Sequence, residues 1–207
     1  MTRVALIDYG SGNLHSCARA LAAAAGDVTV TADPDTIRRA ERIVLPGVGH
    51  FADCAGALRA IPGMVDALEE AVLQGGRPFL GICVGMQLMA DIGLEDGETR
   101  GLGWIHGLVE GLTPSPGLPV PHVGWNALRL PRPHPVMAGL GDQPHAYFTH
   151  SYVFRPEDEG EAAAWCDYGG PFAAAVARGN LIGTQFHPEK SQRVGLTLLA
   201  NFLQWRP

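Results

Sequence analysis

The feature that most constrains the fold is a buried-strand pattern that runs directly into a cysteine flanked by glycines. Pro78 to Ile82 is a short, bounded apolar run of the kind that forms a buried strand. Cys83 follows at once, with Gly81 and Gly85 two residues away on either side. From Met86 onward the apolar residues take helical spacing. The sequence therefore predicts a strand, a sharp turn that carries the cysteine, and a helix.

This turn has the G-x-C-x-G pattern of a nucleophile elbow, with cysteine in place of serine. Glycines suit such a turn because a strained backbone that presents one side chain outward leaves no room for neighbouring Cβ atoms. A sulfur at a helix N-terminus is favoured as a thiolate, since free N–H groups and the helix dipole stabilise negative charge. Most free cysteines are instead small buried apolar residues. Partners elsewhere in the chain must decide between these two interpretations.

Strand and helix patterns alternate through the first half of the chain. Apolar runs predict strands, and the segments between them have helical patterns ended by glycine. This alternation indicates an α/β fold with a parallel sheet, in which functional loops follow the carboxyl ends of the strands. Glycine-containing loops at Asp8, Pro46 and Cys83 should therefore meet at one edge. The predicted strands are Val4–Asp8, Val28–Thr31 and Ile43–Leu45, and the predicted helices are Leu14–Ala25, Cys54–Leu58 and Met64–Leu73.

The second half has shorter apolar runs broken by turn residues, which predict strands that are partly antiparallel. Phe172–Arg178 and Leu181–Phe186 should form a hairpin across Gly179-Asn180, a pair suited to a type II′ turn. No convincing linker interrupts the chain, so we expect a single domain over residues 1–207. The other predicted elements are strands at Trp104-Ile105, Val123–Asn126 and Ala146–Phe148, a surface loop at Pro114–Pro121 and a closing helix at Val194–Leu203.

Charge and composition exclude several classes of partner. The formal net charge of −6 and the absence of a Lys/Arg run argue against nucleic acid and anionic membranes. No apolar run approaches the roughly 18 residues of a membrane span, and the N-terminal run is too short for a signal peptide. The four cysteines are widely spaced, which favours a reduced, cytoplasmic protein in which Cys17, Cys54 and Cys166 are packing residues. No metal-site spacing is present, so neither a metal nor another cofactor is expected.

A cysteine nucleophile needs a base and a group that orients the base. His187-Pro188-Glu189 offers both within three residues. In extended backbone, residues i and i+2 share a face, so His187 and Glu189 could point at a common target. Of the eight histidines, only His187 has this arrangement. A lone histidine after a strand is more often structural, and we assign the others mainly to structure, with a possible further role for His122 and His150.

Two segments together, Gly81–Gln87 and Gln185–Glu189, resemble the class I (triad) glutamine amidotransferases. Within that class, the flanking motifs resemble those of the glutaminase subunits of imidazole glycerol phosphate synthases, from histidine biosynthesis. These motifs run from near the N-terminus to the last helix, so the resemblance covers essentially the whole chain. Departures from the family pattern occur at His50, Val84 and Val123. The matching motifs are Asp8–Asn13, Pro46–Gly49, Pro121–Asn126, Tyr147–Tyr152 and His187–Ser191.

The resemblance implies a flavodoxin-like α/β fold, with a mostly parallel sheet flanked by helices and antiparallel strands in the second half. It also implies that a triad of Cys83, His187 and Glu189 hydrolyses glutamine to glutamate and ammonia through a glutamyl thioester. Backbone N–H groups of Val84 and of Val48 or Gly49 would form the oxyanion hole. The alternative to glutamine binding is an ordinary polar helix residue for Gln87 and a packed strand aromatic for Tyr152. The implied glutamine-binding residues are Gly47, Gly49, Gln87, His150, Ser151 and Tyr152.

In the family, ammonia passes to a (β/α)8-barrel cyclase subunit that makes imidazole glycerol phosphate and AICAR. The resemblance thus implies a heterodimer, with Asn13, Trp125 and Lys190 near the ammonia exit. The alternative for Trp125 is a core aromatic. The glycines around Val48 would let its peptide rotate and complete the oxyanion hole only when the partner carries its substrate.

Three other functions compete with this interpretation. The glutaminase of pyridoxal phosphate synthase performs the same half-reaction, but the Tyr9–Asn13 and His122–Asn126 motifs argue against it. A cysteine hydrolase of γ-glutamyl peptides would share the elbow and the late histidine and would be active alone. An inactive interaction module is disfavoured because all three triad residues are present.

Overall fold

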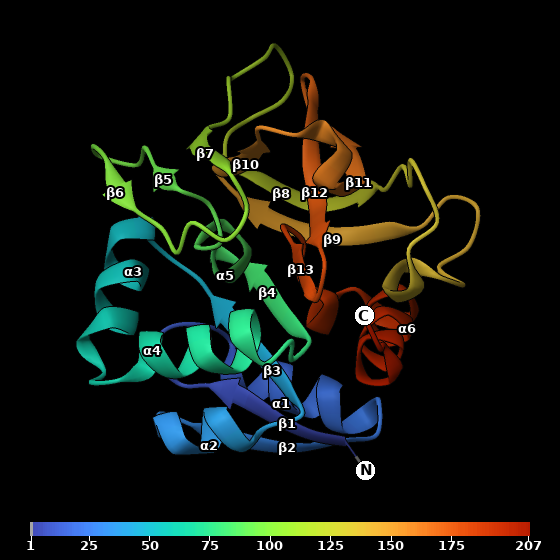
Figure 1. The fold of residues 1–207 in the computed structure, drawn as a ribbon. Coiled ribbons are helices and arrows are strands. Elements are labelled where there is room, and N and C mark those ends of the chain that lie inside the picture. The colour runs from blue at the N-terminus through green and yellow to red at the C-terminus, as the bar shows by residue number, and fades with distance from the viewer. Residues whose placement is uncertain (1) are drawn as a thin grey trace.

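A seven-stranded sheet forms the centre of the computed structural model, which describes residues 2–207 (Figure 1). Its strands are β1 (Thr2–Ile7), β2 (Gly26–Thr31), β3 (Arg42–Gly47), β4 (Phe79–Cys83), β11 (Ala162–Asp167), β12 (Pro171–Arg178) and β13 (Leu181–Thr184). The order is β11-β12-β13-β4-β3-β1-β2. The five strands from β13 to β2 in this order are parallel, and β12 and β11 are antiparallel additions. The predicted mostly parallel α/β sheet is confirmed.

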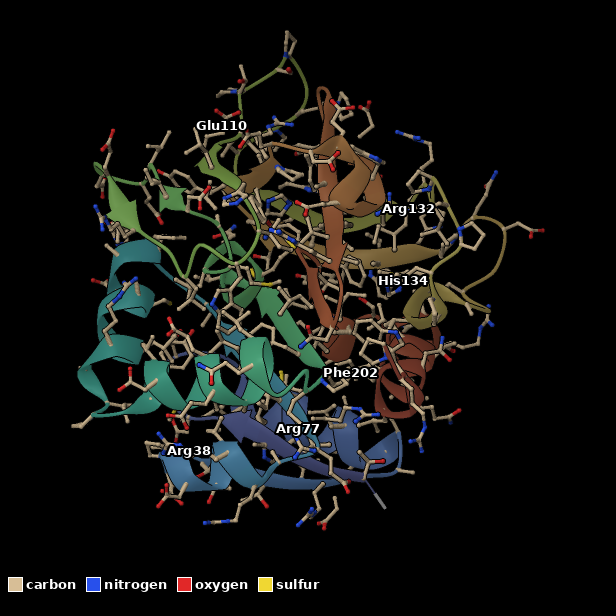
Figure 2. All side chains as sticks on the ribbon, viewed as in Figure 1. Arg38, Arg77, Glu110, Arg132, His134 and Phe202 are labelled. Carbon is tan, nitrogen blue, oxygen red and sulfur yellow. The ribbon has the colours of Figure 1, made fainter. Side chains whose placement is uncertain are left out.

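Helices cover both faces of this sheet. The first and last helices in the sequence, α1 (Leu14–Ala23) and α6 (Gln192–Gln204), pack against each other. On the opposite side in Figure 1 lie α3 (Phe51–Ala60) and α4 (Met64–Leu68). Helix α4 continues into a π-helix, η1 (Glu69–Gln74), and packs on α2 (Pro34–Arg39). Side chains fill the space between sheet and helices, among them Phe202 of α6, labelled in Figure 2 and fully buried. Burial of these apolar faces is the main stabilising term of the fold.

Two small sheets lie beyond the carboxyl ends of β3 and β4 (Figure 1). One contains β10 (Tyr152–Pro156), β7 (Gly107–Gly111), β5 (Ile92–Gly93) and β6 (Thr99–Arg100), in that order. The other pairs β8 (His122–Ala127) with β9 (His145–His150) in antiparallel register. Three single-turn helices complete the chain, η2 (Pro135–Met137), η3 (Glu159–Glu161) and η4 (Pro188–Lys190).

Some sequence expectations differ from the structure. The predicted strand at Trp104-Ile105 is wrong, because both N–H groups donate to the carbonyl of Met89 instead of to a neighbouring strand. Helix α2 was not predicted. Its signal was local: the Asp33 side chain caps it by accepting from two backbone N–H groups, and Pro34 occupies the first helical position.

The hairpin and the helix after the cysteine refine two further predictions. Of the pair Gly179-Asn180, only Gly179 has a positive φ, 55°, as a type II′ turn requires at its first central residue. The helix after Cys83 begins at Val84, not Met86, and is a single turn, α5 (Val84–Gln87). Within residues 2–207, no helix is long and apolar enough to cross a membrane.

Candidate active site

Strand register brings three segments from distant parts of the sequence to one edge. β4 lies between β3 and β13, with Gly47 beside Cys83 and Thr184 beside Ile82. Since parallel strands end at a common edge, the loop after Gly47, the cysteine and the segment that follows Thr184 converge there. The expected meeting of glycine loops at one edge is thus confirmed for β3 and β4.

Cys83 sits on a strained turn. Its φ is 55° and its ψ is −112°, a positive-φ conformation that residues with a Cβ seldom adopt. A Cβ on Gly81 would lie 2.6 Å from the carbonyl oxygen of Gly85, and a Cβ on Gly85 would overlap the carbonyl of Leu45. Glycine is therefore required on both sides of the cysteine for steric reasons, as a nucleophile elbow demands.

His187 and Glu189 form a buried pair. The Nδ1 atom of His187 is 2.8 Å from Oε1 of Glu189, and the two side chains are 2% and 1% exposed. The expectation of extended backbone is confirmed for His187 itself, with φ −96° and ψ 99°, but is wrong after it. Pro188–Lys190 forms the single-turn helix η4, in which proline occupies the first position. The turn still folds the carboxylate back onto the ring, so the predicted pairing is present in a different backbone conformation.

The other nitrogen of His187 faces Cys83. Nε2 is buried and has no aligned hydrogen bond in the described part of the chain. Burial by itself lowers the pKa of His187, but interactions with Cys83 and Glu189 outweigh it and raise the pKa to about 9. The ring is therefore held ready to carry a proton between the sulfur and a leaving group, with Glu189 fixing its orientation.

Cys83 and His187 open onto a cavity of about 270 Å³. This volume is just below the roughly 300 to 1,000 Å³ of pockets for drug-sized ligands, which suits a small substrate. Of the predicted glutamine-binding residues, Gly47 is absent from the lining, because it packs against the elbow near Gly85 and Tyr9. The lining residues are Val48, Gly49, Cys83, Val84, Gln87, Glu95, Pro121, Thr149, His150, Ser151, Tyr152 and His187.

The predicted oxyanion loop, residues 47–49, is tied to the loop after β1. The hydroxyl of Ser11 accepts from the N–H of Val48 at 3.1 Å and donates to the Val48 carbonyl at 2.7 Å. The Cys54 sulfur lies 3.3 Å from the same hydroxyl and 3.4 Å from the same carbonyl. Cys54 is thus buried, as expected of a packing residue, but it also contacts this loop. The Val48 N–H is engaged by Ser11 and is not directed at the sulfur of Cys83.

Comparison with known proteins agrees with this geometry. The family model for glutamine amidotransferase class-I matches residues 5–205. The chain belongs to this family of amidotransferases. The subunit HisH of imidazole glycerol phosphate synthase from Mesorhizobium japonicum is 55% identical, with 99% of this chain and 100% of that protein covered. The same subunit from Zymomonas mobilis is 57% identical, with 99% and 96% covered.

Solved structures show the same fold at lower identity. A glutamine amidotransferase has a TM-score of 0.72 at 21% identity, covering 95% of this chain and 98% of its own. PurLQS from Thermotoga maritima has a TM-score of 0.74 at 19% identity, with 99% of each chain covered. The expected class I amidotransferase fold is therefore confirmed.

Two buried histidines, His122 and the cavity-lining His150, connect β8 and β9 of this amidotransferase. His122 Nδ1 lies 3.0 Å from His150 Nε2, and His150 Nδ1 lies 2.9 Å from the carbonyl oxygen of Tyr152. Burial lowers the pKa of His122 to about 4 and that of His150 to about 3, so both rings are neutral at pH 7. A carbonyl only accepts, so His150 carries its proton on Nδ1 and accepts from His122 on Nε2. The two histidines therefore form a directed hydrogen-bond chain that ends at the Tyr152 carbonyl.

The predicted interface residues lie in different settings. Trp125 is 48% exposed and packs edge-on to Tyr147 at 6.1 Å, so its alternative reading as a core aromatic is wrong. Lys190 Nζ lies 5.7 Å from the centre of the same Tyr147 ring. Asn13 instead caps α1, its side chain accepting from the N–H of Ser16. Tyr147, which joins Trp125 and Lys190, lay within a matched motif but was given no role by sequence reasoning.

Sequence reasoning also missed Glu95 and Gln185. Glu95 lines the cavity, and its Oε2 accepts from the N–H of Phe51 at 2.8 Å. Its only sequence signal is an acidic cluster in a loop, Glu95, Asp96 and Glu98. Gln185 lies two residues before His187, within a matched motif, and contacts Cys83. In residues 2–207, no group of three or more His, Cys, Asp or Glu side chains could hold a metal ion.

Proposed function

We propose that this chain is the glutaminase subunit of an imidazole glycerol phosphate synthase and that Cys83, His187 and Glu189 are its catalytic triad. The observation that carries the proposal is that Cys83 and His187 line one cavity while Glu189 binds the far side of His187. Full-length identity of 55% to curated HisH subunits supports the choice of this synthase. The match of the family model to residues 5–205 supports a single catalytic domain.

In the proposed reaction, His187 takes the proton of Cys83, and the thiolate attacks the side-chain amide carbon of glutamine. The C–N bond then breaks, His187 gives its proton to the departing ammonia, and a glutamyl thioester remains. Water, with its proton taken by His187, hydrolyses the thioester to glutamate. Glu189 holds the imidazole in the tautomer that leaves Nε2 facing the sulfur.

The cavity supplies groups for both ends of glutamine. The carboxylate of Glu95 is suited to the α-ammonium group, and Gly49, Gln87 and the segment 150–152 surround the remaining polar atoms. The backbone N–H of Val84, directly after the nucleophile, is the first oxyanion donor. The second donor comes from Val48 or Gly49.

The oxyanion hole is gated by rotation of the Val48 peptide. Its N–H is bound to Ser11, which supports a resting state that lacks this donor. Gly49 has a φ of 97°, and a Cβ there would meet no atom within 4 Å, so the loop is free of steric barriers on that side. Arrival of the partner with its nucleotide would release Val48 from Ser11 and turn the donor toward Cys83.

The partner is a (β/α)8-barrel cyclase subunit, which forms a heterodimer with this chain and receives ammonia. Trp125 and Lys190, joined by the Tyr147 ring, and Asn13 are the proposed contacts. A cytoplasmic location is part of the proposal and is supported by the four free cysteines.

The test is glutamate release from glutamine, measured for this chain alone and with a barrel cyclase subunit plus its ribulosyl nucleotide substrate. Cys83→Ala serves as the blank, and Cys166→Ala, a buried cysteine of β11, as the matched control. Strong activation by the partner that is lost only in the Cys83 variant is expected. Full activity without the partner would refute gating and favour a stand-alone hydrolase. No activity with the cyclase would favour a different acceptor subunit.

A further inference from the structure

Gln185 lies between Cys83 and Gln87 behind the cavity lining, and the proposed mechanism gives it no role. It follows β13 directly, is fully buried, and is anchored by its backbone N–H, which donates to Ala174 at 2.8 Å. Its side-chain Nε2 lies 3.6 Å from the sulfur of Cys83, and its Oε1 lies 3.0 Å from Nε2 of Gln87. A buried amide that touches the reacting sulfur is a candidate for a role in the chemistry.

The hydrogen-bond network fixes which end of this amide faces the sulfur. The carbonyl oxygen of Tyr152 can only accept, and Gln87 approaches it at 3.0 Å, so the atom of Gln87 at this contact is the donor Nε2. The same Nε2 is the neighbour of Gln185, which must therefore present its oxygen there. The other end of Gln185, its NH2 group, is left to face Cys83. The backbone carbonyl of Tyr152 thus sets the orientation of both side-chain amides, first that of Gln87 and through it that of Gln185.

We propose that Gln185 donates an amide N–H to the Cys83 sulfur, holding the thiolate in position for attack and stabilising its charge. This proposal rests on the proposed function only in taking Cys83 as the nucleophile. Gln87, whose two N–H groups both go to protein oxygens, then acts as the residue that positions Gln185 and keeps only its Oε1 free toward glutamine.

The surroundings of the sulfur explain why such a donor is useful. Cys83 is 4% exposed, so its sulfur depends on protein groups rather than water for hydrogen-bond donors. Its titratable neighbours are His187 on one side and Tyr9 and Cys54 on another, and burial, aided by the nearby sulfurs, raises the pKa of Tyr9 so that it stays neutral. His187 supplies positive charge only while it is protonated. Gln185 supplies a fixed donor that is independent of pH.

The test uses alkylation of Cys83 by iodoacetamide, followed by mass spectrometry of its peptide between pH 5 and 10. Gln185→Met keeps the side-chain length and removes the donor. Gln204→Met, at an exposed glutamine at the end of α6, is the matched control, and Cys83→Ala is the blank. In Gln185→Met we expect half-maximal reaction to move up by roughly one pH unit, with a roughly five- to tenfold slower reaction at neutral pH. The control should match the wild type.

Alkylation needs neither glutamine nor the partner, so its result separates this proposal from the proposed function. Gln185→Glu is the second variant. Its carboxylate can still accept from Gln87 but offers the sulfur no amide donor, and we expect the same shift or a larger one. In glutaminase assays, kcat should fall while KM for glutamine changes little, because Gln185 does not line the cavity. An unshifted pH profile in either folded variant would overturn the proposal, whatever the effect on kcat.

Discussion

The steric requirement of the elbow predicts the outcome of one small substitution, Gly81→Ala. The new Cβ would lie 2.6 Å from the Gly85 carbonyl oxygen, 2.7 Å from its carbon and 2.8 Å from the Met86 Cα, whereas ordinary contacts begin at 3.4 Å. All three atoms are backbone, so no side chain can rotate away. Gly81 does not have a positive φ, and the substitution therefore tests space alone.

The magnitude follows from the displacement. The backbone after Cys83 would have to retreat by about 0.8 Å to restore contact distance. Overpacking of this kind costs roughly 1 to 3 kcal/mol of unfolding free energy. A displacement near 1 Å in catalytic groups costs roughly a hundredfold in rate, so kcat should fall by roughly 30- to 100-fold.

The assay compares Gly81→Ala with Gly56→Ala, the same change on an exposed turn of α3. A Cβ on Gly56 would meet no atom within 4 Å, and alanine is favoured over glycine in helices by roughly 0.5 to 1 kcal/mol. Urea unfolding should therefore show opposite signs for the two variants, and only Gly81→Ala should lose partner-activated glutaminase activity. Wild-type activity and stability in Gly81→Ala would refute the steric account of the elbow.

Three other substitutions test the base, the oxyanion loop and the interface. The pKa of His187 is raised to about 9, so the ring stays protonated until the pH passes that value. Glu189→Gln should lower this pKa and move the alkaline limb of the kcat–pH profile to lower pH. A limb that does not move would contradict the His187–Glu189 pairing. Ser11→Ala frees the Val48 N–H and should raise glutaminase activity measured without the partner, whereas unchanged activity contradicts the proposed restraint. Trp125→Ala should weaken cyclase binding in calorimetry roughly tenfold or more, with an unchanged unfolding midpoint.

The sequence predicted the fold where a local pattern was sufficient. The strands before Cys83 were recognisable because apolar runs alternate with helical segments, and the hairpin at Gly179 because the turn requires glycine. It failed at Trp104-Ile105, where an apolar pair packs as a turn bonded to Met89. It also misjudged the backbone after His187, because a proline in extended sequence and one that begins a helical turn look alike.

The amino-acid sequence by itself identified Cys83, His187 and Glu189 as the candidate triad, because the G-x-C-x-G turn and the three-residue His–Glu pair are local in the chain. The tertiary structure alone decided that the Gln185 amide faces the sulfur, that Ser11 holds Val48, and that Gly47 packs behind the elbow. Gln185 and Cys83 are 102 residues apart, and only the parallel register of β13 beside β4 brings them into contact. The direction of the amide depends in turn on one carbonyl of β10, and no sequence pattern encodes such a long-range chain of hydrogen bonds.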